Sequence, residues 1–458
     1  MSINSAMLSG VSGLVANSAA LGAISDNIAN ANTVGYKRNV TQFEDLVTAT
    51  AAVGAYNSGG VTAQTSQLID QQGQLSQSTS ATDLGIAGNG FFVVTDNATG
   101  LTGADTRSFT RAGNFTPDSS GYLKNAAGLY LQGWLADSNG VISPDPSDLS
   151  KLSTINTTNI GTVPNPTTTA SLNLNLNSAQ ATSAQEATYN PAVAATSMAA
   201  STAGGAGVTP DYSTQITVYD AKGSAHTFQL DFLKSSTANQ WHAEMVAVPA
   251  SDVAGTTNGL ISSGTVAFNP DGTLDTTNTT FSTAATAIGA STDTTGVHWA
   301  SSLGLPTQSV DVNLAKSPAS VTQYAATSTL NSTTADGGPA GTLSGVTVDK
   351  TGNVIANFSN GAQRTIARVA VATFQNADGL QSISGDAYRA TTNSGSFTLK
   401  EPGEGGAGDI SPSTLESSTV DLSTEFTGLI ITQRAYAASS KIITTADEML
   451  QTLISSKQ

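Results

Sequence analysis

The chain has 458 residues, which suggests about three domains, and only 11% of them are charged, against roughly 25% in ordinary soluble domains. The net charge is −16 and Lys and Arg form no cluster, which argues against a nucleic-acid partner because phosphate binding needs grouped basic side chains. The absence of Cys excludes disulfides, thiolate catalysis and Cys-based zinc sites.

Residues 2–30 carry apolar side chains at alternating spacings of four and three, which is typical of one face of a packed helix. Gly residues lower the helicity of this segment by up to about 1 kcal/mol each relative to Ala, so we expect a helix only where it packs on a partner. Small residues would also let another backbone approach closely. The face consists of Ile3, Met7, Gly10, Leu14, Asn17, Leu21, Ile24 and Ile28.

The same N-terminal region has no basic residue before Lys37 and no continuous apolar run of the length that a signal peptide or membrane helix requires. We therefore expect neither a cleaved secretory signal nor membrane insertion.

The short basic pair Lys37-Arg38 is interpreted as a solvated turn.

The middle of the chain is predicted to be rich in β-structure, with polar connections. Residues 31–82 and 401–417 read as linkers, because they are dominated by small and polar residues. Alternating apolar residues and turns rich in Gly, Asn and Asp predict strands in 83–144 and again in 345–400, which we expect to form one first β domain. Residues 145–344 would then be an inserted, β-rich outer domain.

The C-terminal segment 418–458 has the strongest pattern, a second seam at heptad spacing that predicts one helix of roughly 50 Å. Ser418 to Asp421 supplies a capping signal at its start. The seam consists of Leu422, Phe426, Leu429, Gln433, Tyr436, Ser440, Ile443, Asp447, Leu450 and Ile454. A helical hairpin within one chain is the simpler reading. Polar residues interrupt both seams, however, and two such weak stripes could hardly sustain so long a helix alone, so we favour packing between copies. We interpret Gln433, Ser440 and Asp447 as residues that set its register.

Together these elements predict a mixed fold, mainly β with terminal α-helices, in which 1–30 and 418–458 form a coiled-coil-like helical domain and the other domains are nested and discontinuous. No catalytic, cofactor-binding or metal-binding site is expected. The Asp-x-x-Gly strings at 118–121, 220–223 and 349–352 lack the ligand pattern of calcium loops and are predicted to be hairpin turns. The residues His226, His242 and His298 are read as ordinary surface or partly buried side chains.

Short motifs at both ends carry a resemblance to a known family. Asp26-Asn-Ile-Ala-Asn30 followed by Thr33-Val-Gly-Tyr-Lys-Arg38 resembles the N-terminal signature of the bacterial flagellar rod and hook proteins. The stretches Gln433 to Tyr436 and Thr444 to Leu450 are similar to the terminal helix of that family. Ala87-Gly-Asn-Gly-Phe-Phe-Val-Val94 resembles the start of its first β domain. The resemblance covers roughly 1–145 and 345–458.

The resemblance implies a structural, non-enzymatic subunit of the flagellar hook, a curved and flexible tube that transmits torque from rod to filament. Its terminal helices would line the inner wall of the tube. The implied partners are further copies, the rod, hook cap and hook–filament junction proteins, and the flagellar export apparatus. The location would be extracellular, in the flagellum, after export without cleavage of a signal peptide. The alternatives are a distal rod or junction subunit and, from another class, a secreted adhesin or hydrolase.

Overall fold

The computed structural model describes residues 3–46, 60–100, 106–137, 140–158, 160–281, 284–315 and 320–456, and the side chains from residue 6 onward. The chain divides into two compact units. The first unit combines Met1–Ile160, Gly345–Ala356 and Arg364–Gln458, and the second combines Gly161–Ser344 and Asn357–Gln363. Each unit is therefore built from segments that are distant in the sequence.

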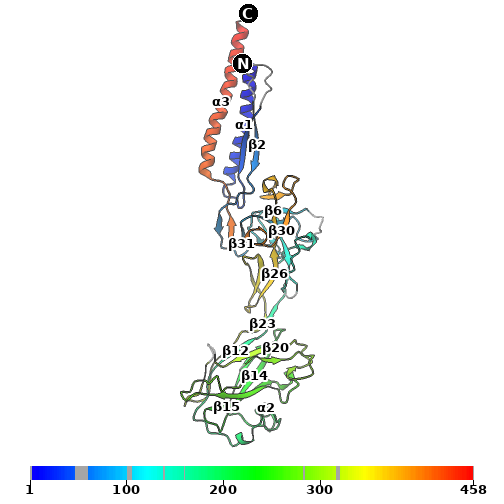
Figure 1. The fold of residues 1–458 in the computed structure, drawn as a ribbon, viewed down its shortest axis with the longest axis vertical. Helices are drawn as coiled ribbons and strands as arrows, with labels where there is room; N and C mark the ends of the chain where they lie inside the picture. The colour runs from blue at the N-terminus through cyan, green and yellow to red at the C-terminus, as the bar shows by residue number, and fades with distance from the viewer. Residues whose placement is uncertain are drawn as a thin grey trace. The chain divides into compact units, whose positions relative to one another are not determined.

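Two long helices at the ends of the chain pack against each other in the first unit (Figure 1). Helix α1 spans Ile3–Ala29 and helix α3 spans Leu422–Ser455. Their contacts run in opposite order along the chain, since Gly10 lies beside Ile443 and Gly428 lies beside Ile24, so the pair is antiparallel. Asp421 caps α3 by accepting a hydrogen bond from the amide of Thr424 at 2.8 Å. The intrachain pairing that we judged less favoured is thus present in the single chain.

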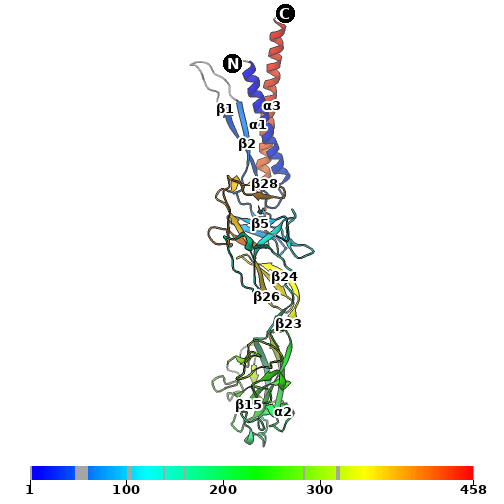
Figure 2. The same cartoon turned by 90° about the vertical axis from the view of Figure 1, so that its right-hand side faces the viewer.

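A β-hairpin lies along α1, in a region where we expected only an extended linker (Figure 2). It consists of β1 (Asn39–Leu46) and β2 (Gly60–Gln67), paired antiparallel over their full lengths. The amide of Val61 donates to the Ser12 hydroxyl at 3.2 Å. The hairpin has little hydrophobic core of its own, which is why its composition predicts a linker. Two isolated strands are marginally stable, and here packing on α1 stabilises them.

The β part of the first unit interleaves strands from both halves of the chain. Val371 pairs with Phe92, Ala367 with Leu135, and Ala387 with Thr110. The expected fold class, mainly β with terminal helices and discontinuous domains, is confirmed. The strands are β3 (Leu75–Gln77), β4 (Leu84–Ala87), β5 (Phe91–Thr95), β6 (Ser108–Thr110), β7 (Thr116–Pro117), β8 (Leu123–Lys124), β9 (Tyr130–Leu135), β10 (Leu152–Thr154), β24 (Leu343–Val348), β25 (Asn353–Phe358), β26 (Gln363–Val369), β27 (Val371–Thr373), β28 (Gln381–Ile383), β29 (Ala387–Arg389), β30 (Thr398–Lys400), β31 (Asp409–Pro412) and β32 (Thr414–Glu416).

The second unit has its main core between two sheets, ordered β13-β14-β15-β17 and β18-β20-β12-β21 with β22 beside β12, and a small separate cluster of Met198, Val208 and Leu233. Strands also occur in 161–210 and 275–342, where small and polar residues are frequent, and there they pair mainly with one another, as β12 does with β20, β21 and β22. The strands are β11 (Val163–Asn165), β12 (Thr169–Asn175), β13 (Tyr212–Tyr219), β14 (Ala225–Lys234), β15 (Gln240–Val248), β16 (Val253–Ala254), β17 (Leu260–Ala267), β18 (Thr286–Ile288), β19 (His298–Trp299), β20 (Gln308–Asn313), β21 (Ser320–Thr322), β22 (Thr329–Ala335) and β23 (Gly338–Gly341).

Short helical turns punctuate both units: α2 (Met198–Thr202), η1 (Leu149–Lys151), η2 (Glu186–Thr188), η3 (Ala250–Asp252) and η4 (Ala377–Gly379). The three Asp-x-x-Gly strings are turns, as predicted. In each string the Asp carboxylate accepts backbone amides two and four residues later, and the Gly has a positive φ that other residues rarely adopt.

Candidate assembly interface

The predicted face of α1 is half-buried rather than fully buried. Its described members with large side chains are Met7, Leu14, Leu21, Ile24 and Ile28. The fully buried positions lie one residue earlier, at Ala16, Ala20, Ala23 and Asn27. Helix α1 contacts both α3 and the β1–β2 hairpin, so its most buried residues lie between these two contact surfaces. The side chain of Ile3 lies outside the described residues.

The predicted face of α3 divides into two groups. Leu429, Ser440, Ile443 and Leu450 are half-buried. The other members, Leu422, Phe426, Gln433, Tyr436, Asp447 and Ile454, are exposed. The heptad pattern therefore mixes residues that are partly covered within the chain with residues that face outward.

Further large apolar side chains are exposed on the same elements. We define the outer apolar surface of α3 by its exposed members Leu422, Phe426, Ile430, Ile431, Met449, Leu453 and Ile454. Ile442 is also half exposed, but its side chain lies beside Gly10 of α1. Ile430 is 52% exposed and Ile454 is 64% exposed. Leu8, Val11 and Val15 are exposed on α1, as are Phe43 and Leu46 on β1. Many of these residues were not predicted from the sequence, because a single apolar stripe was assigned to each helix.

Two Gly residues allow α1 and α3 to approach closely, as the small residues of α1 predicted. A Cβ atom added at Gly10 would lie 3.1 Å from Ile443 and 3.4 Å from Ile442. One added at Gly13 would lie 3.1 Å from the Ser439 hydroxyl. Gly22, by contrast, has open space around it. The glycines at 10 and 13 are therefore packing positions, despite their cost to helicity.

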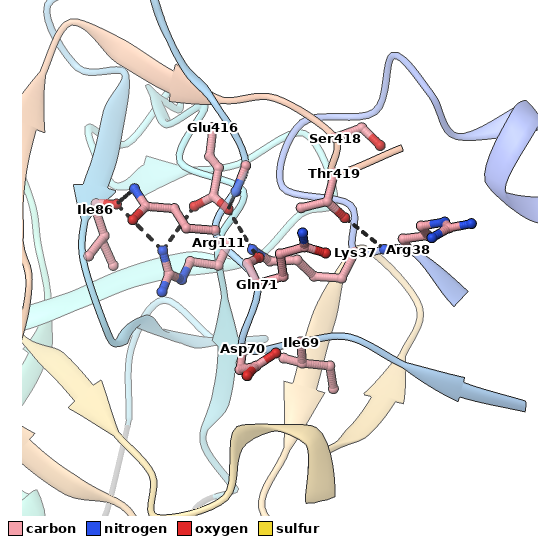
Figure 3. Close-up of polar contacts among 12 residues, drawn as sticks. Lys37, Arg38, Ile69, Asp70, Gln71, Ile86, Arg111, Glu416, Ser418 and Thr419 are labelled. Carbon is pink, nitrogen blue, oxygen red and sulfur yellow. Dashed lines mark hydrogen bonds and ion pairs between the residues drawn. The ribbon is translucent and has the colours of Figure 1, made fainter. Parts of the chain in front are cut away.

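A buried charge cluster lies where the chain leaves α1 and approaches α3, and Figure 3 shows its side chains. We define the charge cluster as Lys37, Arg111 and Glu416. Lys37 Nζ is 2.5 Å from Glu416 Oε1, and Arg111 Nη1 is 3.0 Å from Glu416 Oε2. The side chains of Lys37 and Glu416 are both 0% exposed. Our reading of Lys37 as part of a solvated turn was wrong.

Several neutral groups complete the surroundings of these charges. The Gly73 amide donates to Glu416 Oε1 at 2.8 Å, and Lys37 Nζ also donates to the Gln71 carbonyl. Burial lowers the pKa of the Lys37 ammonium, and the Glu416 carboxylate opposes this effect. Removal of one partner of such a buried pair typically costs about 3–5 kcal/mol, because the remaining charge is left without a counter-ion.

A second ion pair connects the same region to the first turn of α3. Arg38 Nε is 2.5 Å from Glu425 Oε1, and the Glu425 side chain is almost fully buried, whereas Arg38 is partly exposed. Glu425 lies in the first turn of α3, near the positive end of the helix dipole, but the sequence contains no signal for its partner Arg38, which is distant in the chain.

His226 and His298 are more buried than the sequence interpretation expected, whereas His242 is partly buried as predicted. His226 and His242 also have carboxylate partners. His226 lies between Asp252, 2.7 Å from Nδ1, and Asp220, 3.1 Å from Nε2. His242 Nε2 is 3.3 Å from Glu186. Within the residues that the structure describes, no group of three or more His, Asp or Glu side chains could hold a metal ion.

The composition of α1 also differs from the expectation about membranes. Ala6–Ala29 is long and apolar enough to cross a membrane by those two criteria, which a helix packed within a protein also meets. In the structure this segment contacts α3 and the hairpin.

Comparisons with known proteins agree with this arrangement of elements. Four family models match: the flagella basal body rod protein at 7–37, the flagellar hook protein FlgE/F/G D1 domain at 85–173, the flagellar basal body protein FlaE D2 domain at 206–337, and the flagellar basal body rod FlgEFG protein C-terminal at 411–456. The flagellar hook protein FlgE of Caulobacter vibrioides is 40% identical over 592 aligned positions, with all of both chains covered.

The chain belongs to the flagellar hook protein family. The hook protein FlgE of Rhizobium meliloti is 31% identical over 459 residues, again with both chains fully covered. A crystal structure of hook protein FlgE2 from Helicobacter pylori matches 75% of this chain and 100% of its own, with a TM-score of 0.39 and 15% identity. This hook protein is a structural subunit of the bacterial flagellar hook, and the rod, junction, adhesin and hydrolase alternatives are not favoured.

Proposed function

We propose that copies of this hook protein pack through their terminal helices into the wall of a curved, flexible tube that transmits torque from rod to filament. The proposal rests on the outer apolar surface of α3, which is exposed to water in a single chain. Each Ile or Leu side chain gains about 1.5–3 kcal/mol when it is fully buried. A neighbouring copy with exposed Leu8, Val11 and Val15 offers apolar side chains of the same kind.

The proposed interface includes the residues of both predicted seams and extends beyond them. Exposed Phe426 and Ile454 belong to the α3 seam, whereas Ile430 and Ile431 lie outside it. The exposed seam residues Gln433 and Asp447 would set the register between copies, because polar side chains in an apolar interface tolerate few alignments.

Assembly of the purified chain tests the proposal. We expect concentration-dependent polymers from the native chain, and a critical concentration roughly tenfold higher or more for Ile430→Ser, because an interface residue worth about 1.5–3 kcal/mol is lost. Thr427→Ser, an exposed substitution on the same helix, is the control and should assemble normally. Deletion of 422–458 should abolish assembly while circular dichroism still shows folded β-structure. Normal polymers from the Ile430→Ser chain or from the deleted chain would contradict the proposal.

The role that we propose is mechanical rather than catalytic. The weak surface charge supports a mechanism for bending, in which the second units of neighbouring copies slide because few ion pairs must break. Images of straight and curved polymers would test this mechanism, and identical contacts between second units in both forms would contradict it.

Partners and location complete the proposal. We infer contacts with rod, cap and junction proteins at the ends of the polymer, and export through the flagellar apparatus to the outside of the cell without cleavage. The family membership supports both inferences. Mass determination of the chain recovered from isolated hooks tests the last point, since a missing N-terminal segment would contradict export without cleavage.

A further inference from the structure

The roots of the two terminal helices, which we define as residues 35–38 and 416–419, run side by side below the helix pair. The Gly35 amide donates to the Glu416 carbonyl at 2.8 Å, and the Thr419 amide donates to the Tyr36 carbonyl at 3.1 Å. The Arg38 amide donates to the Thr419 hydroxyl at 2.9 Å. Hydrogen bonds of the backbone therefore join the two roots to each other directly, in addition to the contact between α1 and α3.

Glu416 is the centre of this arrangement, because its carboxylate accepts hydrogen bonds from three separate segments. Lys37 comes from the root of α1, Gly73 from the segment before β3, and Arg111 from the β part of the same unit just after β6. Figure 3 shows Lys37 and Arg111 approaching Glu416 from different parts of the chain. Loss of this carboxylate would remove a side-chain hydrogen bond from all three segments at once.

The contact between α1 and α3 provides little information about register by comparison. Most buried positions of α1 are small, at Gly10, Ala16, Ala20 and Ala23, and those of α3 are only Glu425 and Ala446 among the described side chains. Asn27 of α1 is also buried, but its side chain forms hydrogen bonds with Asn39 and Tyr36 and not with α3. The close approach at Gly10 and Gly13 limits the alignment of the two helices, but apolar burial itself is non-directional. Buried hydrogen-bonded charges are directional, and a displaced partner is left without a counter-ion.

We propose that the charge cluster positions the roots of α1 and α3, and thereby fixes which apolar residues of the helix pair face the next copy. The Arg38–Glu425 pair extends the same control to the first turn of α3. This inference rests on the proposed function, because its consequence is read in assembly. Lys37, Arg111 and Glu416 are positioning residues: they act through the helices and need not touch the neighbouring copy.

A variant that separates positioning from stability tests the proposal in the full-length chain. Apolar replacement of a buried ionic group often leaves stability unchanged or improved. We therefore expect the triple variant Lys37→Met, Arg111→Met, Glu416→Met to keep the slow amide exchange of β5. The amides of Gly35 and Thr419 should exchange at least about tenfold faster, because the roots lose their fixed position. The critical concentration for assembly should rise by about tenfold or more.

The single variant Lys37→Met decides the question if the triple variant does not fold, and the same three measurements apply to it. Lys151→Met, an exposed site in the same unit, is the matched control. Native exchange at Gly35 and Thr419 together with native assembly would overturn the proposal. Loss of β5 protection in Lys37→Met would also overturn it, since Lys37 would then serve the β core. Failure of the native chain to polymerise would instead count against the proposed function. The amide exchange of Gly35 and Thr419 would still test whether the charge cluster positions the roots.

Discussion

At the scale of single residues, the informative groups are buried charges that composition gave no reason to suspect. Lys37 is fully enclosed with Glu416, although the two residues lie 379 positions apart. Glu244 on β15 is fully buried in the second unit, where its Oε2 accepts a hydrogen bond from the Ala199 amide at 2.7 Å. Such groups link the stability of their surroundings to pH.

Burial raises the pKa of the Glu244 carboxyl, although the hydrogen bond from the Ala199 amide opposes the shift. The folded chain therefore holds a proton that the unfolded chain releases. This contribution to stability is fully present below the unfolded pKa of about 4.3 and is lost as pH rises through the raised folded pKa. We expect Glu244→Gln, which cannot ionise, to remove that loss and flatten the dependence of stability on pH.

Urea unfolding from about pH 4 to pH 8 measures this effect. A Trp134→Phe background restricts the fluorescence signal to Trp241 and Trp299, both in the second unit. The slope attributable to one group is at most about 1.4 kcal/mol per pH unit. Glu404→Gln, at an exposed turn, should leave the profile unchanged. If Glu244→Gln left the slope of unfolding free energy against pH unaltered, the folded unit would accommodate the ionised Glu244 carboxylate as well as the unfolded chain does.

At the scale of elements, the helix pair depends on which glycines face the partner. Gly10 and Gly22 have the same intrinsic cost within a helix, but only Gly10 lies against α3. The hairpin shows the same principle, because β1 and β2 are stabilised by the side of α1 on which they lie. Neither element is explained by its own composition.

Replacement of Gly10 and Gly22 by the same residue separates the effect of packing between the helices from the effect of intrinsic helix propensity. Gly10→Leu should push α3 away and destabilise the helix pair by about 1–3 kcal/mol, because the added side chain meets Ile442 and Ile443. Gly22→Leu should stabilise α1 by up to about 1 kcal/mol. Amide exchange in α3 measures the result, with faster exchange expected only in Gly10→Leu. Equal behaviour of the two variants would contradict the close approach.

At the scale of the whole molecule, the two units have separate hydrophobic cores. Phe92, Phe115 and Leu131 belong to a core of the first unit, whereas Trp241 and Trp299 belong to the core of the second. Contiguous cores are the basis of cooperative unfolding, so each unit should respond to denaturant as a body of its own.

Urea unfolding should therefore show two transitions with different midpoints. Fluorescence of Trp134 reports the first unit, and fluorescence of Trp241 and Trp299 reports the second. Single-Trp variants distinguish the two signals, and Glu244→Gln should move only the transition of the second unit. Coincident midpoints in all variants would mean that the chain unfolds as one cooperative body.

The sequence by itself determined the class of the fold, the two terminal helices, many of the hairpin turns and the membership of a flagellar family. These features are local, or repeat at short spacing, so neighbouring residues specify them. Asp421 caps α3, and the Gly residues of the Asp-x-x-Gly strings take up positive φ angles because those residue types suit those positions.

Only the tertiary structure decided which side of each helix is covered, where the 39–67 hairpin packs, and what Lys37 does. Each of these depends on segments that are distant in the chain. The heptad rule assumes one partner per helix, but α1 has two, so its enclosed line moved to Ala16, Ala20 and Ala23. Lys37 was read as solvated because basic pairs usually are, and its burial depends on Glu416 and Arg111, which only the fold brings beside it.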